Sequence, residues 1–204
     1  VFNTFYSVFP RGSVWMSSYG DLILLGSNDP IELDRERLKG AWESSEAMRR
    51  HFFTIDLYQP EVLYGQYLFP REKIVGLNPT ERLNTDDKPL LEFTAPFNLY
   101  KPSEMAGIVG TLFGLAEPHP LAESIQAESP YTLLHGRVSI FRTEDLPKDV
   151  LEAQTSESAF LHARLATLLE PSARTEAVRS RLNLALRLDP SNPLALAFAA
   201  LLEL

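Results

Sequence analysis

Two adjacent carboxylates, Asp86 and Asp87, are the residues whose types and spacing best suit chemistry. They lie in the polar stretch 84–88, which predicts a loop. Adjacent carboxylates in a loop can bind an ammonium group, such as a polyamine amine, through charge-assisted hydrogen bonds. A structural role is the alternative: Asp86 and the residues before it cap a turn, while Asp87 pairs with Lys88 or Arg82.

Aromatic side chains near the N-terminus form the second candidate group. Tyr6, Trp15 and Tyr19 could line a pocket, although aromatic residues in or beside strands usually suit the core. The predicted substrate-binding residues are therefore Asp86, Asp87, Tyr6 and Trp15. No residue is predicted to be catalytic or to bind a metal.

Other reactive side chains form weaker patterns. No histidine has a second histidine or a carboxylate at a metal-ligand spacing, so we expect structural or surface roles for His51, His119, His135 and His162. The stretch 49–53 (Arg-Arg-His-Phe-Phe) suits a partner surface, a phosphate contact or a solvated helix face. The absence of cysteine excludes disulfides, thiolate metal sites and cysteine nucleophiles, and no Gly-x-Ser-x-Gly motif occurs.

Composition bounds both the fold and the partners. The chain has 204 residues, of which 45% are apolar, and a formal net charge of -8. These values predict one or two folded domains and argue against a general nucleic-acid binder. The longest apolar run, 105–116, is too short for a membrane helix, so no membrane insertion is expected. Gly110 and Gly114 within it predict close helix packing or a buried turn.

Strand patterns dominate the first part of the chain, up to residue 30. The runs 13–19 and 21–26 are β-prone, and Gly20-Asp21 suits a tight hairpin turn between them. The second run is apolar throughout, which favours a strand buried on both faces. Because an isolated hairpin is marginal in water, we expect further strands to join this pair.

Helical patterns follow the hairpin. Asp34 can cap one helix, and Ser44 or Ser45 can cap a second. The stretch 58–69 predicts a short aromatic-rich helix, and 90–93 predicts a brief strand or extended segment.

The C-terminal quarter is helical in pattern and resembles tetratricopeptide repeats. Apolar and alanine positions recur at three- and four-residue spacing, which predicts helices after Thr155 or Ser156, over 174–188 and from Leu194. The junction 185–195 (Ala-Leu-Arg-Leu-Asp-Pro-Ser-Asn-Pro-Leu-Ala) resembles the turn between two such repeats. This resemblance covers about residues 155–204 and implies a peptide or protein ligand.

A second resemblance covers residues 2–100. The segments FYSVFP at 5–10, VW at 14–15, DLILLGS at 21–27 and LNTDDKPLLEF at 83–93 resemble, in order and spacing, the later part of bacterial spermidine-synthase-like proteins. Larger members of that family are often fused to membrane segments or helical repeats. The resemblance implies a Rossmann-like methyltransferase-type fold and transfer of an aminopropyl group from decarboxylated S-adenosylmethionine to an amine.

The nucleotide-binding half of such a domain has no counterpart in this sequence. No strand is followed by a Gly-x-Gly loop, and Gly107, Gly110 and Gly114 have a different spacing. We therefore expect a chain that is catalytically incomplete by itself, whether or not the intact protein is an enzyme. It is expected to hold no cofactor and to complement its own N-terminal nucleotide-binding half.

These patterns together predict an α+β fold. Residues 1–100 are expected to form the C-terminal half of a spermidine-synthase-like domain, 101–150 an irregular or helical connector, and 151–204 a helical region like tetratricopeptide repeats. A homo-oligomer partner is expected through the hairpin or the last helix. The expected location is the cytoplasm, for a free protein or for the soluble domain of a membrane-anchored one. The alternative function is a non-enzymatic protein-interaction module built from the helical repeats.

Overall fold

The structure of the protein is a computed structural model that divides into two compact units, each built from two separate stretches of the chain. It describes residues 1–18, 21–32, 34–54, 57, 59–75, 83–89, 102–128, 131–138, 152–154, 158–168 and 176–201. Helices and a three-stranded antiparallel sheet are both present, so the α+β expectation is confirmed. The division predicted from sequence character, at residues 100 and 150, stays a prediction.

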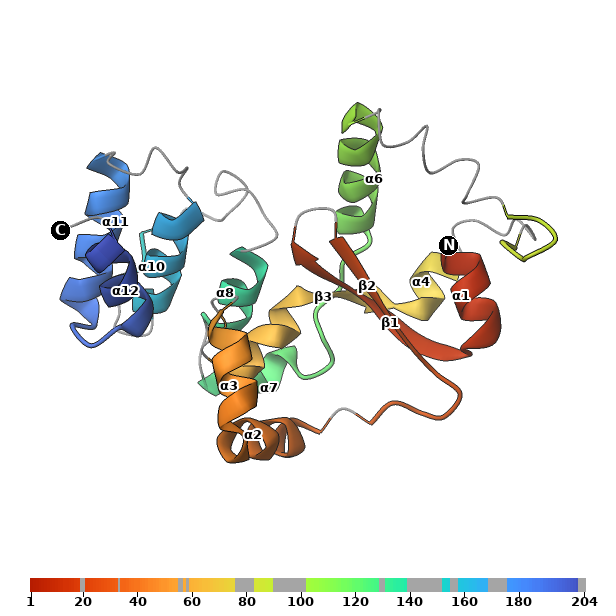
Figure 1. The fold of residues 1–204 in the computed structure, drawn as a ribbon, viewed down its shortest axis with the longest axis horizontal. Helices are drawn as coiled ribbons and strands as arrows, with labels where there is room; N and C mark the ends of the chain where they lie inside the picture. The colour runs from red at the N-terminus through yellow and green to blue at the C-terminus, as the bar shows by residue number, and fades with distance from the viewer. Residues whose placement is uncertain are drawn as a thin grey trace. The chain divides into compact units, whose positions relative to one another are not determined.

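The first unit, Val1–Leu33 with Tyr67–His119, contains the sheet. Its described elements are α1 (Phe2–Val8), β1 (Arg11–Ser18), β2 (Asp21–Ser27), β3 (Tyr67–Pro70), α4 (Arg71–Val75) and α6 (Pro102–Gly114) (Figure 1). The strand order is β2-β1-β3, with both pairs antiparallel. The predicted hairpin and the expected additional strand are therefore confirmed, while Tyr19 and Gly20 of the turn lie outside the described residues.

The prediction that the second strand is buried on both faces is wrong. Among the described strands, β2 pairs with β1 alone, and none of its residues is buried. Ile23 and Leu25 are 43% and 41% exposed, whereas Val14 and Met16 of the central strand β1 are fully buried. An apolar run thus forms a strand here without being buried on both faces, because it lies at the edge of the described sheet.

A helix, not a strand, opens the chain. Phe5 lies in α1, and Phe9, one helical turn later, is the C-terminal cap of that helix. The centroids of their rings are 4.9 Å apart. In an extended strand the same two residues would be about 13 Å apart. A Cβ atom on Gly26 would lie 2.7 Å from both rings, so α1 packs closely on β2 through the missing side chain of this glycine.

The second unit, Asp34–Gln66 with Pro120–Leu204, is helical in its described residues. Its elements are α2 (Arg35–Ser44), α3 (Glu46–Phe53), the 3-10 helix η1 (Pro60–Gln66), α7 (Ala122–Glu128), α8 (Thr132–Val138), α10 (Ala159–Leu168), α11 (Glu176–Leu188) and α12 (Pro193–Leu201) (Figure 1). Among its described residues, the stretch 58–69 is thus helical over η1, and from Tyr67 it forms β3 instead.

Local capping chemistry sets the predicted helix starts. Asp34 accepts a hydrogen bond from the Arg37 N–H at 2.9 Å, and Ser45, rather than Ser44, accepts one from the Met48 N–H at 3.1 Å. At α12, the Asn192 side chain accepts from the Ala195 N–H at 3.0 Å. The predicted caps at 155–156 and the predicted extended segment at 90–93 lie outside the described residues.

Gly65 of η1 and Gly136 of α8 allow the backbones of the two helices to come into direct contact. A Cβ atom on Gly65 would lie 2.9 Å from the Gly136 Cα and would collide with the Leu133 carbonyl oxygen. A Cβ atom on Gly136 would lie 2.9 Å from the Gly65 Cα and would collide with the Val62 carbonyl oxygen. Since backbone atoms cannot rotate away as side chains do, both positions require glycine.

The last three helices form a small-residue core. Alanine and leucine side chains of α10, α11 and α12 make one buried cluster, composed of Ala163, Ala166, Val178, Leu182, Ala185, Leu194 and Ala195. On another side of α10, Leu161 and Leu165 are buried against Tyr131 and Leu134. The three predicted C-terminal helices are confirmed as α10, α11 and α12. In α11 the expected residues Val178, Leu182 and Ala185 are buried. In α12, Leu194, Ala195 and Ala199 are buried, whereas Ala197 and Leu201, which continue the three- and four-residue spacing from Leu194, are exposed.

The glycines of α6 do not pack closely, contrary to the expectation from their spacing. A Cβ atom added to Gly107, Gly110 or Gly114 would meet nothing within 4 Å in the described structure. Val109 and Leu112 of this helix are buried, while Ile108 is exposed. No helix among the described residues has the length and apolar character needed to cross a membrane.

Candidate functional site

Tyr6 lies in the core of the first unit. It is 2% exposed, and its hydroxyl donates a hydrogen bond to the Ser13 carbonyl oxygen at 2.9 Å. The guanidinium of Arg71 lies 5.9 Å from the ring centroid and donates to the Tyr6 carbonyl oxygen at 3.3 Å. Burial raises the pKa of Tyr6 to about 12, so the phenol is neutral at physiological pH.

Trp15 and Tyr6 share a hydrogen-bond partner, Ser13. Its indole N–H donates to the Ser13 hydroxyl at 2.7 Å, on the same residue whose carbonyl accepts from Tyr6. The indole ring contacts two buried rings, those of Tyr67 at 5.4 Å and His119 at 5.6 Å between centroids. Tyr6 of α1 and Trp15 of β1 are thus brought together at Ser13 as packed and hydrogen-bonded side chains.

His119 completes this aromatic group, which sequence reasoning did not assemble. Its ring is 3% exposed and stands edge-on to Tyr67, with centroids 5.0 Å apart and an interplanar angle of 89°. Burial lowers the pKa of His119 to about 4 and raises the pKa of Tyr67 to about 12. Both rings are therefore neutral near pH 7, and no spacing in the sequence links residues so far apart.

Asp86 and Asp87 occupy the tip of a tight turn. The Lys88 N–H donates to the Thr85 carbonyl at 2.9 Å, and the Thr85 N–H donates back to the Lys88 carbonyl at 3.3 Å. Both carboxylates are exposed to solvent. The predicted loop is therefore confirmed, and its two acids project from a backbone fixed by that hydrogen-bonded pair.

This acidic turn is attached to the helix that carries Tyr6. The Asn84 N–H donates to the Thr4 hydroxyl at 2.8 Å, and Thr4 lies in α1. The bond fixes the start of the turn on the first unit. No described contact joins Asp86 or Asp87 directly to Tyr6 or Trp15, so the four predicted residues form two groups rather than one pocket.

Replacing Tyr6 by phenylalanine tests whether its hydroxyl is structural. The change leaves the partly buried Ser13 carbonyl without this donor, so we expect Y6F to lower the free energy of unfolding of the first unit by about 1–2 kcal/mol. Urea unfolding followed by Trp15 fluorescence measures it. The control is S7A, which removes an exposed hydroxyl bonded within the same helix and should change stability by less than about 0.5 kcal/mol. Equal stabilities for Y6F and the parent would contradict this role.

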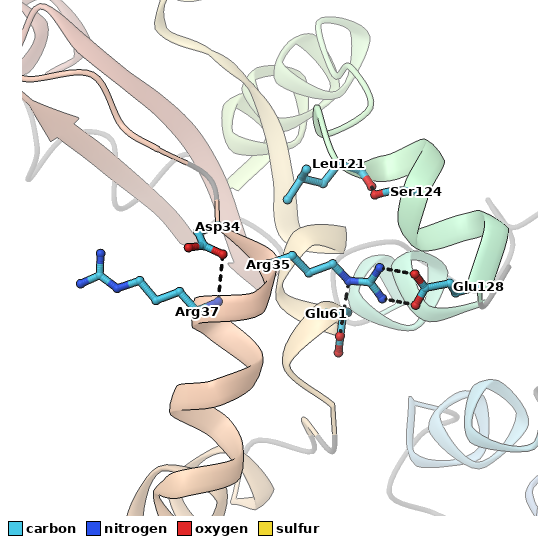
Figure 2. Close-up of polar contacts among 7 residues, drawn as sticks. All are labelled: Asp34, Arg35, Arg37, Glu61, Leu121, Ser124 and Glu128. Atoms are coloured by element: carbon cyan, nitrogen blue, oxygen red, sulfur yellow. Dashed lines mark hydrogen bonds and ion pairs between the residues drawn. The ribbon is translucent and has the colours of Figure 1, made fainter.

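An arginine with two carboxylate partners holds three helices of the second unit together (Figure 2). Arg35 of α2 makes two hydrogen bonds of 2.6 Å to the two carboxylate oxygens of Glu128 in α7. Its Nε lies 3.6 Å from the Glu61 carboxylate in η1. These hydrogen bonds raise the pKa of Arg35 and lower that of Glu128. Since 93 residues separate Arg35 from Glu128, only the tertiary structure identifies this pair.

His162 is the second buried histidine and is held in one neutral tautomer. Its ring lies at 3.0 Å from the Arg181 guanidinium through Nδ1 and at 2.6 Å from the Ala153 carbonyl oxygen through Nε2. Because arginine only donates, Nδ1 is the acceptor and Nε2 carries the proton. Burial, together with the nearby Arg181 charge, lowers the pKa of His162.

The basic–aromatic stretch at 49–53 joins two helices. Arg49 donates hydrogen bonds of 2.6 Å to the Trp42 and Glu43 carbonyl oxygens near the C-terminal end of α2. The Trp42 ring packs on Phe52, with centroids 5.5 Å apart. Arg49 therefore satisfies helix-end carbonyl groups, which the sequence pattern alone did not predict.

A basic cavity lies on the exposed face of α11. It has a volume of about 390 Å³ and is lined by the side chains of Glu176, Arg179, Ser180, Asn183, Leu184 and Arg187. No group of three or more histidine, aspartate or glutamate side chains in the described residues is arranged to hold a metal ion. Compared with known proteins, the chain matches no protein-family model, no curated protein and no solved structure.

Proposed function

We propose that this chain is the C-terminal region of a spermidine-synthase-like protein and is catalytically incomplete by itself. In the intact protein, the amine nitrogen attacks the propyl carbon bound to the sulfonium of decarboxylated S-adenosylmethionine. A C–N bond forms, the C–S bond breaks, methylthioadenosine leaves, and the amine gives up a proton. The first unit contributes the last strands of a Rossmann-like sheet to that domain.

The observation that carries the proposal is the edge of β2 with which no described strand pairs. This strand reads Asp-Leu-Ile-Leu-Leu-Gly-Ser, yet Ile23 and Leu25 are exposed and only β1 pairs with it among the described strands. Exposed apolar edge strands template further pairing, and proteins normally cover them. A strand of the nucleotide-binding half beside β2 would cover this edge and would explain its composition.

The acidic turn supplies the amine-binding side chains in this proposal. Asp86 and Asp87 are exposed, next to each other, and fixed on α1 through the hydrogen bond between Asn84 and Thr4. Two carboxylates on a fixed turn bind an ammonium group more strongly than mobile ones, because less conformational entropy is lost.

The experiment begins with the mass of the native gene product and continues with that product in an aminopropyl-transfer assay. We expect a mass larger than 23.0 kDa by one nucleotide-binding half. The double variant D86N/D87N should raise the KM for putrescine about tenfold, with a smaller change in kcat, because binding is lost before chemistry. The control is D29N, because Asp29 is an exposed acid of the same unit that follows β2 and lies outside the acidic turn. A native mass near 23 kDa would overturn the proposal.

A second candidate function, an interaction module like tetratricopeptide repeats, is favoured by the packing of α10, α11 and α12. Their shared core consists mostly of alanine and leucine, and Asp189 closes the turn between α11 and α12 by accepting from the Ser191 N–H and hydroxyl. Stacked helix pairs of this kind present surfaces for peptides. Peptide binding by the chain alone, without a nucleotide-binding half, distinguishes this function from the first.

A further inference from the structure

The exposed face of α11 carries a regular row of polar side chains. Arg179, Asn183 and Arg187 follow one another at four-residue intervals, so they lie above one another on one side of the helix. All three are exposed, and they line the same cavity of about 390 Å³. The opposite face of α11, with Val178, Leu182 and Ala185, is buried in the helical core, so the row is fixed on a packed helix.

The two arginines of this row are available for a ligand. Within the described residues, neither Arg179 nor Arg187 forms an ion pair with a carboxylate, whereas Arg35 has two carboxylate partners and Arg50 has one. The chain as a whole carries a net charge of -8. A patch with two guanidinium groups is therefore basic against an acidic background, which favours a negatively charged partner and disfavours a general nucleic-acid surface.

The spacing of the row fits an extended peptide. Eight residues of helix place Arg179 and Arg187 about 12 Å apart along the axis. In an extended chain, residues i and i+4 are about 13 Å apart and point to the same side. Two carboxylates four residues apart would thus each meet one guanidinium. The Asn183 amide between them can bond to the peptide backbone, and Leu184 and Ser180 border the middle of the row.

We propose that this row on α11, defined by Arg179, Asn183 and Arg187, is a binding site for an extended peptide segment of a partner protein that carries two acidic residues four positions apart. The inference rests on the second proposed function, and it names the partner's chemistry and the register of its charges. Glu176, at the N-terminal end of the cavity, repels a third acid placed beyond Arg179 and so limits the acidic segment to that length.

Fluorescence anisotropy with three labelled peptides tests the proposal. The first contains Asp-Thr-Val-Thr-Asp, the second contains Thr-Asp-Val-Asp-Thr with the same charge at a shorter spacing, and the third contains Asn-Thr-Val-Thr-Asn. We expect the first to bind at least fivefold more tightly than the second, and the third to bind weakest. Added salt should weaken binding of the first, since both ion pairs are exposed.

Matched variants locate the site. R179Q and R187Q should each weaken binding of the first peptide about fivefold, and E176Q should strengthen it, because a repulsive charge is removed. R37Q is the control, since Arg37 is an exposed arginine on α2 of the same unit. Circular dichroism should show an unchanged helical signal for all four variants, because the substituted side chains are solvent-exposed.

Other outcomes separate this inference from the function on which it rests. Equal binding of the two acidic peptides would overturn the proposed spacing of the two acids. Tighter binding of a single-stranded oligonucleotide would overturn the proposed class of partner. If the asparagine peptide is the one that binds, and R179Q and R187Q do not weaken its binding, the row on α11 is not the binding site. The interaction module would then remain in place. Binding of none of the peptides would overturn the inference, and a negative result on a wide peptide array would remove the interaction module as well.

Discussion

Replacing Gly136 by alanine is expected to destabilise the second unit by about 3 kcal/mol or more. The added Cβ would collide with the Val62 carbonyl oxygen and lie 2.9 Å from the Gly65 Cα. Relief requires η1 and α8 to separate, and that movement would disturb the packing of Val62 and Leu133, which are both buried. Overpacking against backbone belongs to the most destabilising class of single substitutions. G65A should have a similar effect, since it introduces the same collision from the other side.

Fluorescence of Trp42 in a W15F background measures this loss. The protein has two tryptophans, Trp15 in the first unit and Trp42 in the second, so each unit has its own reporter. The matched control is G40A in α2, where an added Cβ would meet nothing within 4 Å. Because glycine is a poor helix former, G40A should stabilise the unit by about 1 kcal/mol. Similar unfolding curves for G136A and G40A would contradict the backbone contact between η1 and α8.

The first unit is expected to lose stability as the pH falls from about 6.5 to about 4. Burial among Trp15 and Tyr67 lowers the pKa of His119 in the folded state to about 4, whereas its ordinary value is 6.5. Between these values the unfolded chain binds the proton and the folded chain does not, so acid favours unfolding. Stability from this group is fully present above pH 6.5. The difference between the two pKa values corresponds to a loss of roughly 3 kcal/mol at pH 4.

Urea unfolding of the first unit at a series of pH values tests this expectation, with Trp15 as the reporter in a W42F background. The variant H119F should remove a large part of the pH dependence, because phenylalanine keeps an aromatic ring and cannot be protonated. H51Q is the control, since His51 is exposed on α3 of the second unit. Parallel pH profiles for H119F and the parent would show that another group is responsible. Should H119F fail to fold, the parent profile still decides the sign, because a stability that is flat or rises toward pH 4 contradicts the prediction.

Several local features followed from the sequence because they depend on neighbouring residues. Asp34 and Ser45 cap their helices through bonds to the third residue after them, which is a short-range geometry. The antiparallel pairing of β1 with β2 follows from two β-prone runs separated by a turn. The helices α11 and α12 follow from periodic apolar positions and from the Asp-Pro turn between them.

The failed local predictions concern burial and the choice between helix and strand. The run Leu22–Leu25 is apolar enough for an interior strand, yet β2 lies at the edge of the described sheet. The aromatic opening of the chain has high β-propensity, yet it forms α1, where Phe5 packs over Gly26. In both cases the partner that decided the outcome is not adjacent in the sequence.

The sequence by itself determined the α+β composition, the starts of α2 and α3, the hairpin and the acidic turn at Asp86 and Asp87, since each depends on interactions within a few residues. Only the tertiary structure decided that Trp15 packs with Tyr67 and His119, that Arg35 pairs with Glu128, and that Gly65 meets Gly136. These contacts join residues far apart in the chain. The aromatic and glycine contacts depend on burial and close packing, and the Arg35–Glu128 pair depends on charge-assisted hydrogen bonds. Both kinds of interaction exist only after the distant segments have come together.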